Sequence, residues 1–191
     1  MPKRTVKRLC WELESEKLQL TPAELRRMHK VRMARSRAAL AKLAQASQAD
    51  DLFYCLAPAA LGAYYLGDFV QAQTLAQQAI AASQDYTSNW NYSNAIHTGH
   101  TVLGLVALQN GQMGLALEHL QMSGDVKGSP QLGSFGPHML LAKELLIHGQ
   151  AVHVAAYFEQ CRKFWNMGQV WLDVWHKKIS KGQVPHFVMH L

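Results

Sequence analysis

The sequence contains no apolar run of the length that a membrane-spanning helix requires. Crossing the hydrocarbon core takes about 18 or more consecutive apolar residues, whereas polar or charged residues interrupt every apolar stretch of this chain. The stretch MPKRTVKRLCWELESEKL likewise contains no apolar segment of the kind found in secretory signal peptides. We therefore expect a cytoplasmic protein that does not enter a membrane.

Cysteine is scarce, and strand-like patterns are missing. The three cysteines, Cys10, Cys55 and Cys161, are far apart in the sequence, and no two of them form a CxxC pair. An odd, scattered set of this kind indicates reduced thiols and no disulfide framework. No segment alternates apolar and polar residues as a half-buried strand does, so the sequence predicts an all-α fold.

Positive charge is concentrated near one end of the chain. Residues 1–48 hold 12 of the 19 lysines and arginines but only 4 of the 13 acidic residues. The rest of the chain, with 7 basic and 9 acidic residues, is close to neutral. A basic segment of this kind can contact phosphates or an acidic partner, although such segments more often form a solvated helix face.

The basic segment contains a clear helix start at Thr21-Pro22-Ala23-Glu24. Threonine is a good N-cap, proline suits the first turn, and a glutamate three residues after the cap completes a capping box. Apolar residues then recur at roughly helical spacing up to about Asp50, which predicts one long helix or two helices joined near Ser36. The cations of this basic arm are Arg26, Arg27, Lys30, Arg32, Arg35 and Arg37, preceded by Lys3, Arg4, Lys7 and Arg8.

Three glycines, Gly67, Gly111 and Gly149, each separate two apolar segments of helical character. Small or nearly small residues would let the two antiparallel helices of each pair approach closely. The sequence therefore predicts three helix pairs. Such residues recur seven positions before, five after and twelve after each glycine: Ala60, Gly104 and Ala142; Ala72, Ala116 and Val154; Ala79, Ser123 and Cys161.

This spacing resembles the tetratricopeptide repeat, most clearly at Leu103-Gly104 and at Gly67-Asp68-Phe69. The turn glycines are 44 and 38 residues apart, whereas the family repeats at about 34 residues. The additional residues lie in the polar segment 83–94 and in the Gly- and Pro-rich segment 123–137. The resemblance implies a short right-handed solenoid of about three helix pairs. Residues 95–187 also resemble small bacterial stand-alone repeat proteins without an assigned activity.

We expect three parts: a basic helical N-terminal segment at 1–50, the repeats at 51–164, and an aromatic C-terminal capping helix and tail at 165–191. Aromatic and apolar residues of the last part, such as Trp171 and Trp175, recur at helical spacing with lysines on the other side. An amphipathic helix of this kind suits the cap that closes a repeat stack.

In proteins of this family the first helix of each pair lines a concave groove, which suits an extended or helical peptide. The resemblance therefore implies a non-enzymatic interaction scaffold without a cofactor, whose partner is a protein or peptide. Ordinary packing between repeats explains the groove tyrosines equally well. The groove residues would be Tyr54, Tyr64, Tyr65, Thr98, Thr101, Gln109, Met139 and Lys143.

Histidine is frequent, with ten residues, and His97 and His100 lie one helical turn apart. Imidazoles on neighbouring helices can converge on a metal, but no cysteine or carboxylate accompanies these residues at ligand spacing, so we predict no metal site. No nucleophile elbow, HExxH motif or phosphate loop is present to organise a catalytic site. A small pocket beside segment 123–137 would be lined by Asn94, His97, His100, Ser134 and His138.

Three functional hypotheses follow from the sequence. The first is the interaction scaffold that binds a peptide or protein in its groove. The second is a nucleic-acid- or ribosome-associated factor that docks through the basic arm, although a single tryptophan among these residues gives little support for stacking on bases. The third is an enzyme or small-ligand sensor that uses the histidine pocket. The oligomeric state is not predictable from these patterns.

Overall fold

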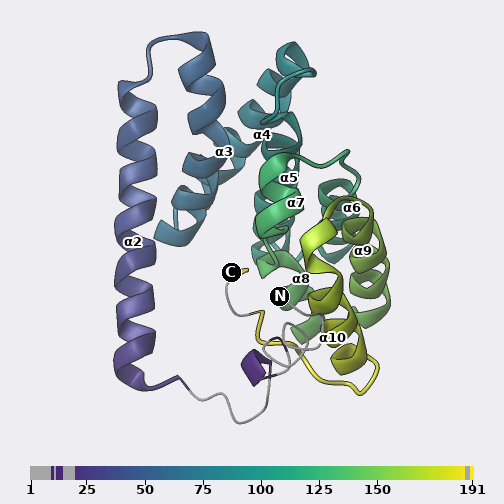
Figure 1. The fold of residues 1–191 in the computed structure, drawn as a ribbon. Helices are drawn as coiled ribbons and strands as arrows, with labels where there is room; N and C mark the ends of the chain where they lie inside the picture. The colour runs from purple at the N-terminus through teal and green to yellow at the C-terminus, as the bar shows by residue number, and fades with distance from the viewer. Residues whose placement is uncertain (1–9, 11, 15–19, 188–189) are drawn as a thin grey trace. The chain divides into compact units, whose positions relative to one another are not determined.

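The computed structural model describes residues 10, 12–14, 20–187 and 190–191. Over these residues the chain forms nine α-helices and two short 3-10 helices, without a strand, which confirms the all-α fold class (Figure 1). None of the helices in this part of the chain combines the length and apolar character that crossing a membrane would need. Lys3, Arg4, Lys7 and Arg8 lie outside the described residues.

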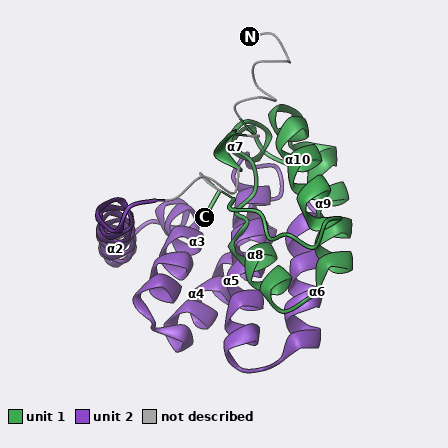
Figure 2. Cartoon of the chain, turned by 90° about the horizontal axis from the view of Figure 1, so that it is seen from below, with its two compact units in different colours: residues 1–19, 127–191 green, residues 20–126 purple. Residues whose placement is uncertain are grey.

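The chain forms two compact units, which we describe separately. Unit 1 consists of Met1–Gln19 and Lys127–Leu191, and unit 2 of Leu20–Val126 (Figure 2). The basic helix thus belongs to unit 2 together with the first two helix pairs. The division of the sequence at residues 50 and 164 stays a prediction.

The first helix of unit 2 begins where the capping box predicts. Helix α2, Pro22–Gln45, is continuous through Ser36. The Glu24 amide donates a hydrogen bond to the Thr21 hydroxyl at 3.3 Å, and the Thr21 amide donates to the Glu24 carboxylate at 2.8 Å. Both orphan amides at the helix start are therefore satisfied by side chains, as the Thr-x-x-Glu pattern predicted.

Two helix pairs complete unit 2, and each turns at a predicted glycine. Gly67 and Gly111 have backbone φ angles of 85° and 72°, a left-handed conformation that costs glycine little and other residues more. The Asp68 carboxylate then caps the second helix of the first pair by accepting from the Gln71 amide at 2.9 Å. The helices are α3, Ala49–Leu66; α4, Phe69–Ser83; α5, Tyr92–Gln109; and α6, Met113–Gly124, with η1 at Gln84–Tyr86.

Small residues form much of the core of unit 2. Ala60, Ala72 and Ala79 are completely buried, as their fixed offsets from Gly67 predicted. Helices α2 and α3 approach closely, because a Cβ atom added at Gly62 would lie 2.9 Å from the backbone oxygen of Ser36. The two backbones meet almost directly at this point, so α2 is packed as an integral helix of the unit.

Unit 1 contains the third predicted helix pair, which turns at Gly149 with a φ of 77°. The Gly- and Pro-rich segment 123–137 contains a short helix capped by Ser129, whose hydroxyl accepts from the Leu132 amide at 3.0 Å. The helices are α7, Pro130–Phe135; α8, Leu140–Ile147; α9, Ala151–Phe164; and α10, Gln169–Ile179, with η2 at Asn166–Gly168.

Large aromatic side chains fill the core of unit 1. The ring of Trp175 lies 5.6 Å from that of Trp165, 5.9 Å from Phe158 and 4.9 Å from Phe187, measured between centroids. The lysines of residues 165–191 were expected to face away from the core. This expectation is wrong for Lys178, which is only 5% exposed. Lys178 is buried because it pairs with Glu14.

Candidate functional site

The predicted groove tyrosines lie along α3, where the basic helix α2 reaches one of them. Tyr54, Tyr64 and Tyr65 are all partly buried. The guanidinium carbon of Arg32 lies 4.7 Å from the centre of the Tyr65 ring, within the range of a cation–π interaction. Burial raises the pKa of Tyr65 to about 12. Arg32 and Tyr65 were predicted to belong to two different binding surfaces, but in the structure they contact each other.

The other predicted groove residues differ widely in exposure. Thr101 is buried, and its hydroxyl donates to the His97 carbonyl at 2.8 Å. Met139 is completely buried, and it belongs to unit 1 together with the partly buried Lys143. In unit 2, Thr98 is partly buried and Gln109 is exposed. A groove that joins these residues stays a prediction, and the buried Thr101 and Met139 are its least accessible members.

Tyr54 instead belongs to an aromatic cluster at the start of α3, which we call the Trp90 platform: Phe53, Tyr54, Tyr86 and Trp90. The ring centroids of Tyr54 and Trp90 are 5.6 Å apart and their planes differ by 25°. Phe53 and Tyr86 stack at 4.2 Å with nearly parallel rings. Phe53 is 1% exposed, whereas Trp90 is 50% exposed. The platform therefore presents an indole to solvent above a packed aromatic base.

Hydrogen bonds fix the segment that carries Trp90. The Tyr86 hydroxyl donates to the Asp50 carboxylate at 2.6 Å, and this bond is the main cause that raises the pKa of Tyr86 to about 12. The Asn89 amide group donates to the Tyr54 hydroxyl at 2.9 Å, and its oxygen accepts from the Asn91 backbone amide at 2.8 Å. Trp90 thus lies between two anchored residues. Trp90 was not predicted as a site residue, because segment 83–94 has the pattern of an insertion between repeats.

The two neighbouring histidines of the predicted pocket face packed surroundings. A carbonyl oxygen can only accept, so the His97 Nδ1 atom donates to the Ser123 oxygen at 2.9 Å. Burial lowers the pKa of His97 to about 4. His100 Nδ1 lies 3.1 Å from His119 Nδ1, so one of these rings donates to the other. Burial, and then the neighbouring His119, lower the pKa of His100 to about 4 as well.

His119 was not predicted, although its position could have been inferred from the helix pair. It lies eight residues after Gly111, and His100 lies eleven before it, so a hairpin that turns at this glycine brings the two close together. The ring pair joins α5 to α6, and burial also lowers the pKa of His119. A hydrogen bond between two neutral imidazole rings is sufficient to explain why histidines occupy these two positions.

The remaining members of the predicted pocket are divided between the units. The Asn94 side chain donates to Asn91 Oδ1 at 2.9 Å in unit 2. In unit 1, Ser134 is exposed, and the partly buried His138 accepts from the Leu140 amide at 3.3 Å. Among the described residues there is no group of three or more His, Cys, Asp or Glu side chains that could hold a metal ion. A pocket that unites all five residues stays a prediction.

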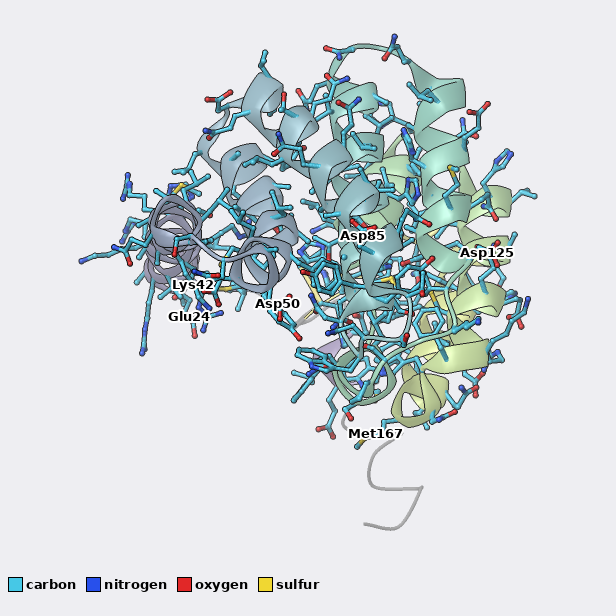
Figure 3. The ribbon with its side chains drawn as sticks, turned by 90° about the horizontal axis from the view of Figure 1, so that it is seen from above. Glu24, Lys42, Asp50, Asp85, Asp125 and Met167 are labelled. Carbon is cyan, nitrogen blue, oxygen red and sulfur yellow. The ribbon has the colours of Figure 1, made fainter. Side chains whose placement is uncertain are left out.

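The basic arm is a largely exposed face of α2. Arg26, Arg27, Lys30 and Arg35 are exposed, and Ser36 is the only buried residue of the helix. In the stick view, which looks along α2, the side chains of this helix radiate outward, and Glu24 and Lys42 are labelled beside it (Figure 3). Helix α2 therefore carries a dense positive charge that most of its side chains hold in solvent.

Comparison of the chain with family models, curated proteins and solved structures finds no match. The resemblance to tetratricopeptide repeats therefore stays a prediction that depends on residue spacing alone. The candidate sites are distinguished by their geometry: the Trp90 indole and most cations of α2 are exposed, whereas the His97 and His100 rings are buried.

Proposed function

We propose that the protein is a non-enzymatic interaction scaffold that binds a partner protein or peptide through unit 2. Its three glycine-turned helix pairs support this proposal, because paired antiparallel helices with small residues at their contacts build tetratricopeptide-like stacks. In this proposal the pairs α3–α4, α5–α6 and α8–α9 succeed one another in a short right-handed solenoid. The partner covers the surface that a scaffold of this kind leaves exposed to solvent.

The observation that carries the proposal is the half-exposed indole of Trp90. Tryptophan and tyrosine are the residues most enriched among those that dominate binding energy. A side chain already held by its neighbours loses little conformational entropy when a partner covers it. The stacking of Trp90 on Tyr54 and the bonds from Asn89 supply this preorganisation.

The surroundings of the Trp90 platform indicate the chemistry of the partner. Asp50 and Asp85 are exposed beside the aromatic residues of this region, and no lysine or arginine occurs in segment 83–94. An indole face attracts cations as well as apolar groups. The partner should therefore present an apolar or basic side chain to Trp90 and make few contacts through carboxylates.

A photoreactive amino acid in place of Trp90 would identify this partner in cell extract. The matched position is Phe135, which is 77% exposed and belongs to unit 1. We expect a cross-linked partner from position 90 and not from position 135. The purified partner should then bind Trp90→Ala at least about thirtyfold more weakly, as for a hot-spot residue worth 2 kcal/mol or more. Equal binding by wild type and Trp90→Ala would contradict the proposal.

A second candidate function is favoured by the exposure of the α2 cations. A helix with seven lysines and arginines, one acidic residue and one buried residue can neutralise several phosphates of a nucleic acid. Binding to a labelled 20-nucleotide RNA should then weaken steeply with salt. Each phosphate contact contributes about 0.9 for duplexes, or about 0.7 for single strands, to the slope of log affinity against log salt.

The variant with Arg26, Arg27, Lys30 and Arg35 changed to alanine tests this candidate. We expect a lower slope and weaker RNA binding, while Trp90→Ala leaves both unchanged. A control variant with Lys163 and Lys177 changed to alanine removes cations of unit 1 and should bind RNA as the wild type does. An RNA affinity that does not change with salt would exclude phosphate binding through α2.

A further inference from the structure

Unit 1 contains a buried carboxylate that neither the scaffold proposal nor the basic helix explains. Glu14 is 2% exposed, and its amide donates to the Cys10 carbonyl at 3.0 Å, which closes one helical turn. An ionised side chain is costly to bury unless charges and hydrogen bonds replace its water. The surroundings of Glu14 should therefore contain such groups.

Four donors meet the two carboxylate oxygens. Oε1 accepts from the Trp175 indole at 2.8 Å and from the Phe187 backbone amide at 2.9 Å. Oε2 accepts from the His186 amide at 2.7 Å and lies 3.5 Å from the Lys178 ammonium. Lys178 also donates to the Glu14 carbonyl. We call these donors the carboxylate socket: Trp175, Lys178, His186 and Phe187.

The backbone at the socket has the form of an anion-binding turn. His186 and Phe187 donate through consecutive amides, and Phe187 has a φ of 54°. A left-handed conformation is uncommon and unfavourable for a residue with a bulky side chain. Consecutive amides beside a left-handed residue form a concave nest that binds anions. This backbone conformation is the second observation, beside the charge pairing, that points to an anionic ligand.

Among the described residues, the donors belong to residues 175–187, whereas the carboxylate that accepts from them belongs to residue 14, more than 160 positions away in the sequence. Glu14 thus occupies the carboxylate socket as a ligand would, because it comes from a segment that is distant in the sequence. Without a carboxylate, three N–H groups would lose their acceptor and the 5%-exposed Lys178 ammonium would lose its negative partner, which is unfavourable in a buried site. A carboxylate from another molecule would satisfy the same donors.

We propose that the carboxylate socket is a peptide-binding site for a glutamate side chain, and that Glu14 occupies it as an intrachain ligand. A partner peptide that presents a glutamate beside apolar residues displaces or replaces the segment around Glu14. This site is separate from the Trp90 platform, because its donors and Glu14 all belong to unit 1. Its failure would leave the proposed scaffold function untouched.

Acetate tests the ligand chemistry in the full-length chain. Glu14→Ala removes the atoms of one acetate ion and leaves the four donors in place. We expect acetate to raise the thermal midpoint of this variant saturably, whereas acetamide at the same concentration and sodium chloride at the same ionic strength do not. Glu12→Ala is the matched control, since Glu12 is exposed in the same turn. A response of Glu14→Ala equal to that of Glu12→Ala would overturn the carboxylate site.

If Glu14→Ala does not fold in buffer, the same comparison is made on refolding. Acetate should restore the helical circular dichroism signal and acetamide should not. Failure of both additives would overturn the proposal. Lys178→Met in the Glu14→Ala background should weaken the response to acetate at least about tenfold, because one charged donor is lost.

A synthetic peptide of residues 8–18 tests the peptide assignment. The peptide should bind full-length Glu14→Ala, and a peptide with glutamine in place of Glu14 should bind at least about tenfold more weakly. Wild-type chain should bind either peptide more weakly still, because its own Glu14 occupies the socket. Equal binding of the two peptides, or rescue by acetate without any peptide binding, would overturn the assignment of a glutamate peptide as ligand.

Discussion

Unit 2 brings its helices together through alanine and glycine, whereas unit 1 fills its core with large aromatic rings. Ala60, Ala72 and Ala79 are completely buried in unit 2. In unit 1, Trp165 and Trp175 are at most 2% exposed. Small residues let helix backbones approach one another, while rings must interlock with the gaps that their neighbours leave. The two units should therefore respond differently when a single methyl group is added.

The aromatic core leaves the least room, and Gly168 is where it is tightest. A Cβ atom at Gly168 would lie 1.9 Å from a ring carbon of Trp165, which is itself in contact with Trp175. Gly168→Ala should lower the free energy of unfolding by about 3 kcal/mol or more, at the upper end of overpacking effects. Chemical denaturation followed by circular dichroism would measure this loss.

Gly114→Ala is the control for this comparison, because no atom lies within 4 Å of a Cβ added there. Gly114 is in the first turn of α6, where alanine should leave stability unchanged or raise it by up to about 1 kcal/mol. Similar unfolding free energies for the two variants would show that the Trp165 ring is free to move aside.

The corresponding site in unit 2 joins two backbones. A Cβ atom at Gly62 would meet the Ser36 oxygen at 2.9 Å and the Ser36 Cα at 3.2 Å, and neither atom can rotate away. We expect Gly62→Ala to lower the free energy of unfolding by about 2–3 kcal/mol and to weaken the packing of α2 on α3. Hydrogen exchange should show faster exchange in residues 22–45.

Gly99→Ala provides the matched comparison. A Cβ atom there would lie 2.6 Å from Cγ1 of Ile80 and 3.2 Å from the backbone oxygen of Ala76, so its shortest contact is with a side chain, whereas the shortest contacts at Gly62 are with backbone atoms. Gly99→Ala should therefore cost less than Gly62→Ala. The opposite order would mean that α2 is loosely attached and that small residues do not control the approach of helices in this unit.

Unit 2 should also lose stability in mild acid, because its buried histidines are neutral. The folded-state pKa of His97 is about 4, below the ordinary value of about 6.5. The unfolded chain therefore takes up protons first as the pH falls. The stabilising contribution of neutral His97 is complete above about pH 6.5 and is lost progressively as the pH approaches 4. Between pH 7 and pH 5 this loss amounts to about 2 kcal/mol.

Urea denaturation at several pH values would measure the effect. His97→Asn keeps an amide donor for the Ser123 carbonyl and removes the titration, so its stability should depend less on pH than that of the wild type. His29→Asn, at an exposed position of α2, should keep the wild-type dependence. A wild-type pH dependence in His97→Asn would show that other groups, such as His100 with His119, account for the acid sensitivity.

The contrast between the units also explains what the sequence could reveal. The small residues of unit 2 stand at fixed distances from Gly67 and Gly111, so local spacing predicted the helix pairs and the burial of Ala60 and Ala79. The core of unit 1 depends on contacts such as Trp175 with Glu14, which are 161 residues apart in the sequence. No local pattern reports a contact at that separation, which is why Lys178 was expected in solvent.

The candidate sites follow the same rule. Tyr54 was predicted as a groove residue because it lies on a helix whose register the turn glycine defines, and its groove role stays a prediction. Trp90 was missed because its exposure depends on Asn89 and Tyr86 meeting residues of α3 about 35 positions earlier. His119 could have been paired with His100 by counting from Gly111, since both lie on one hairpin. Sequence spacing thus located contacts within a helix pair better than contacts made by the connecting segments.

The smallest expected effect distinguishes the two roles of the basic helix. Arg32 lies over Tyr65, whereas Arg35 is exposed. Arg32→Gln should lower the free energy of unfolding by about 0.5–1 kcal/mol, the range for a partly exposed cation–π contact. Arg35→Gln should change it by less than about 0.5 kcal/mol, as most surface substitutions do. Paired denaturation curves measured under identical conditions would resolve the difference.

If both variants lower stability equally, the positive charge of α2 acts through its general electrostatic field and not through the Tyr65 ring. If neither does, Arg32 is as available to an anionic partner as Arg35, and both would then belong to one binding face.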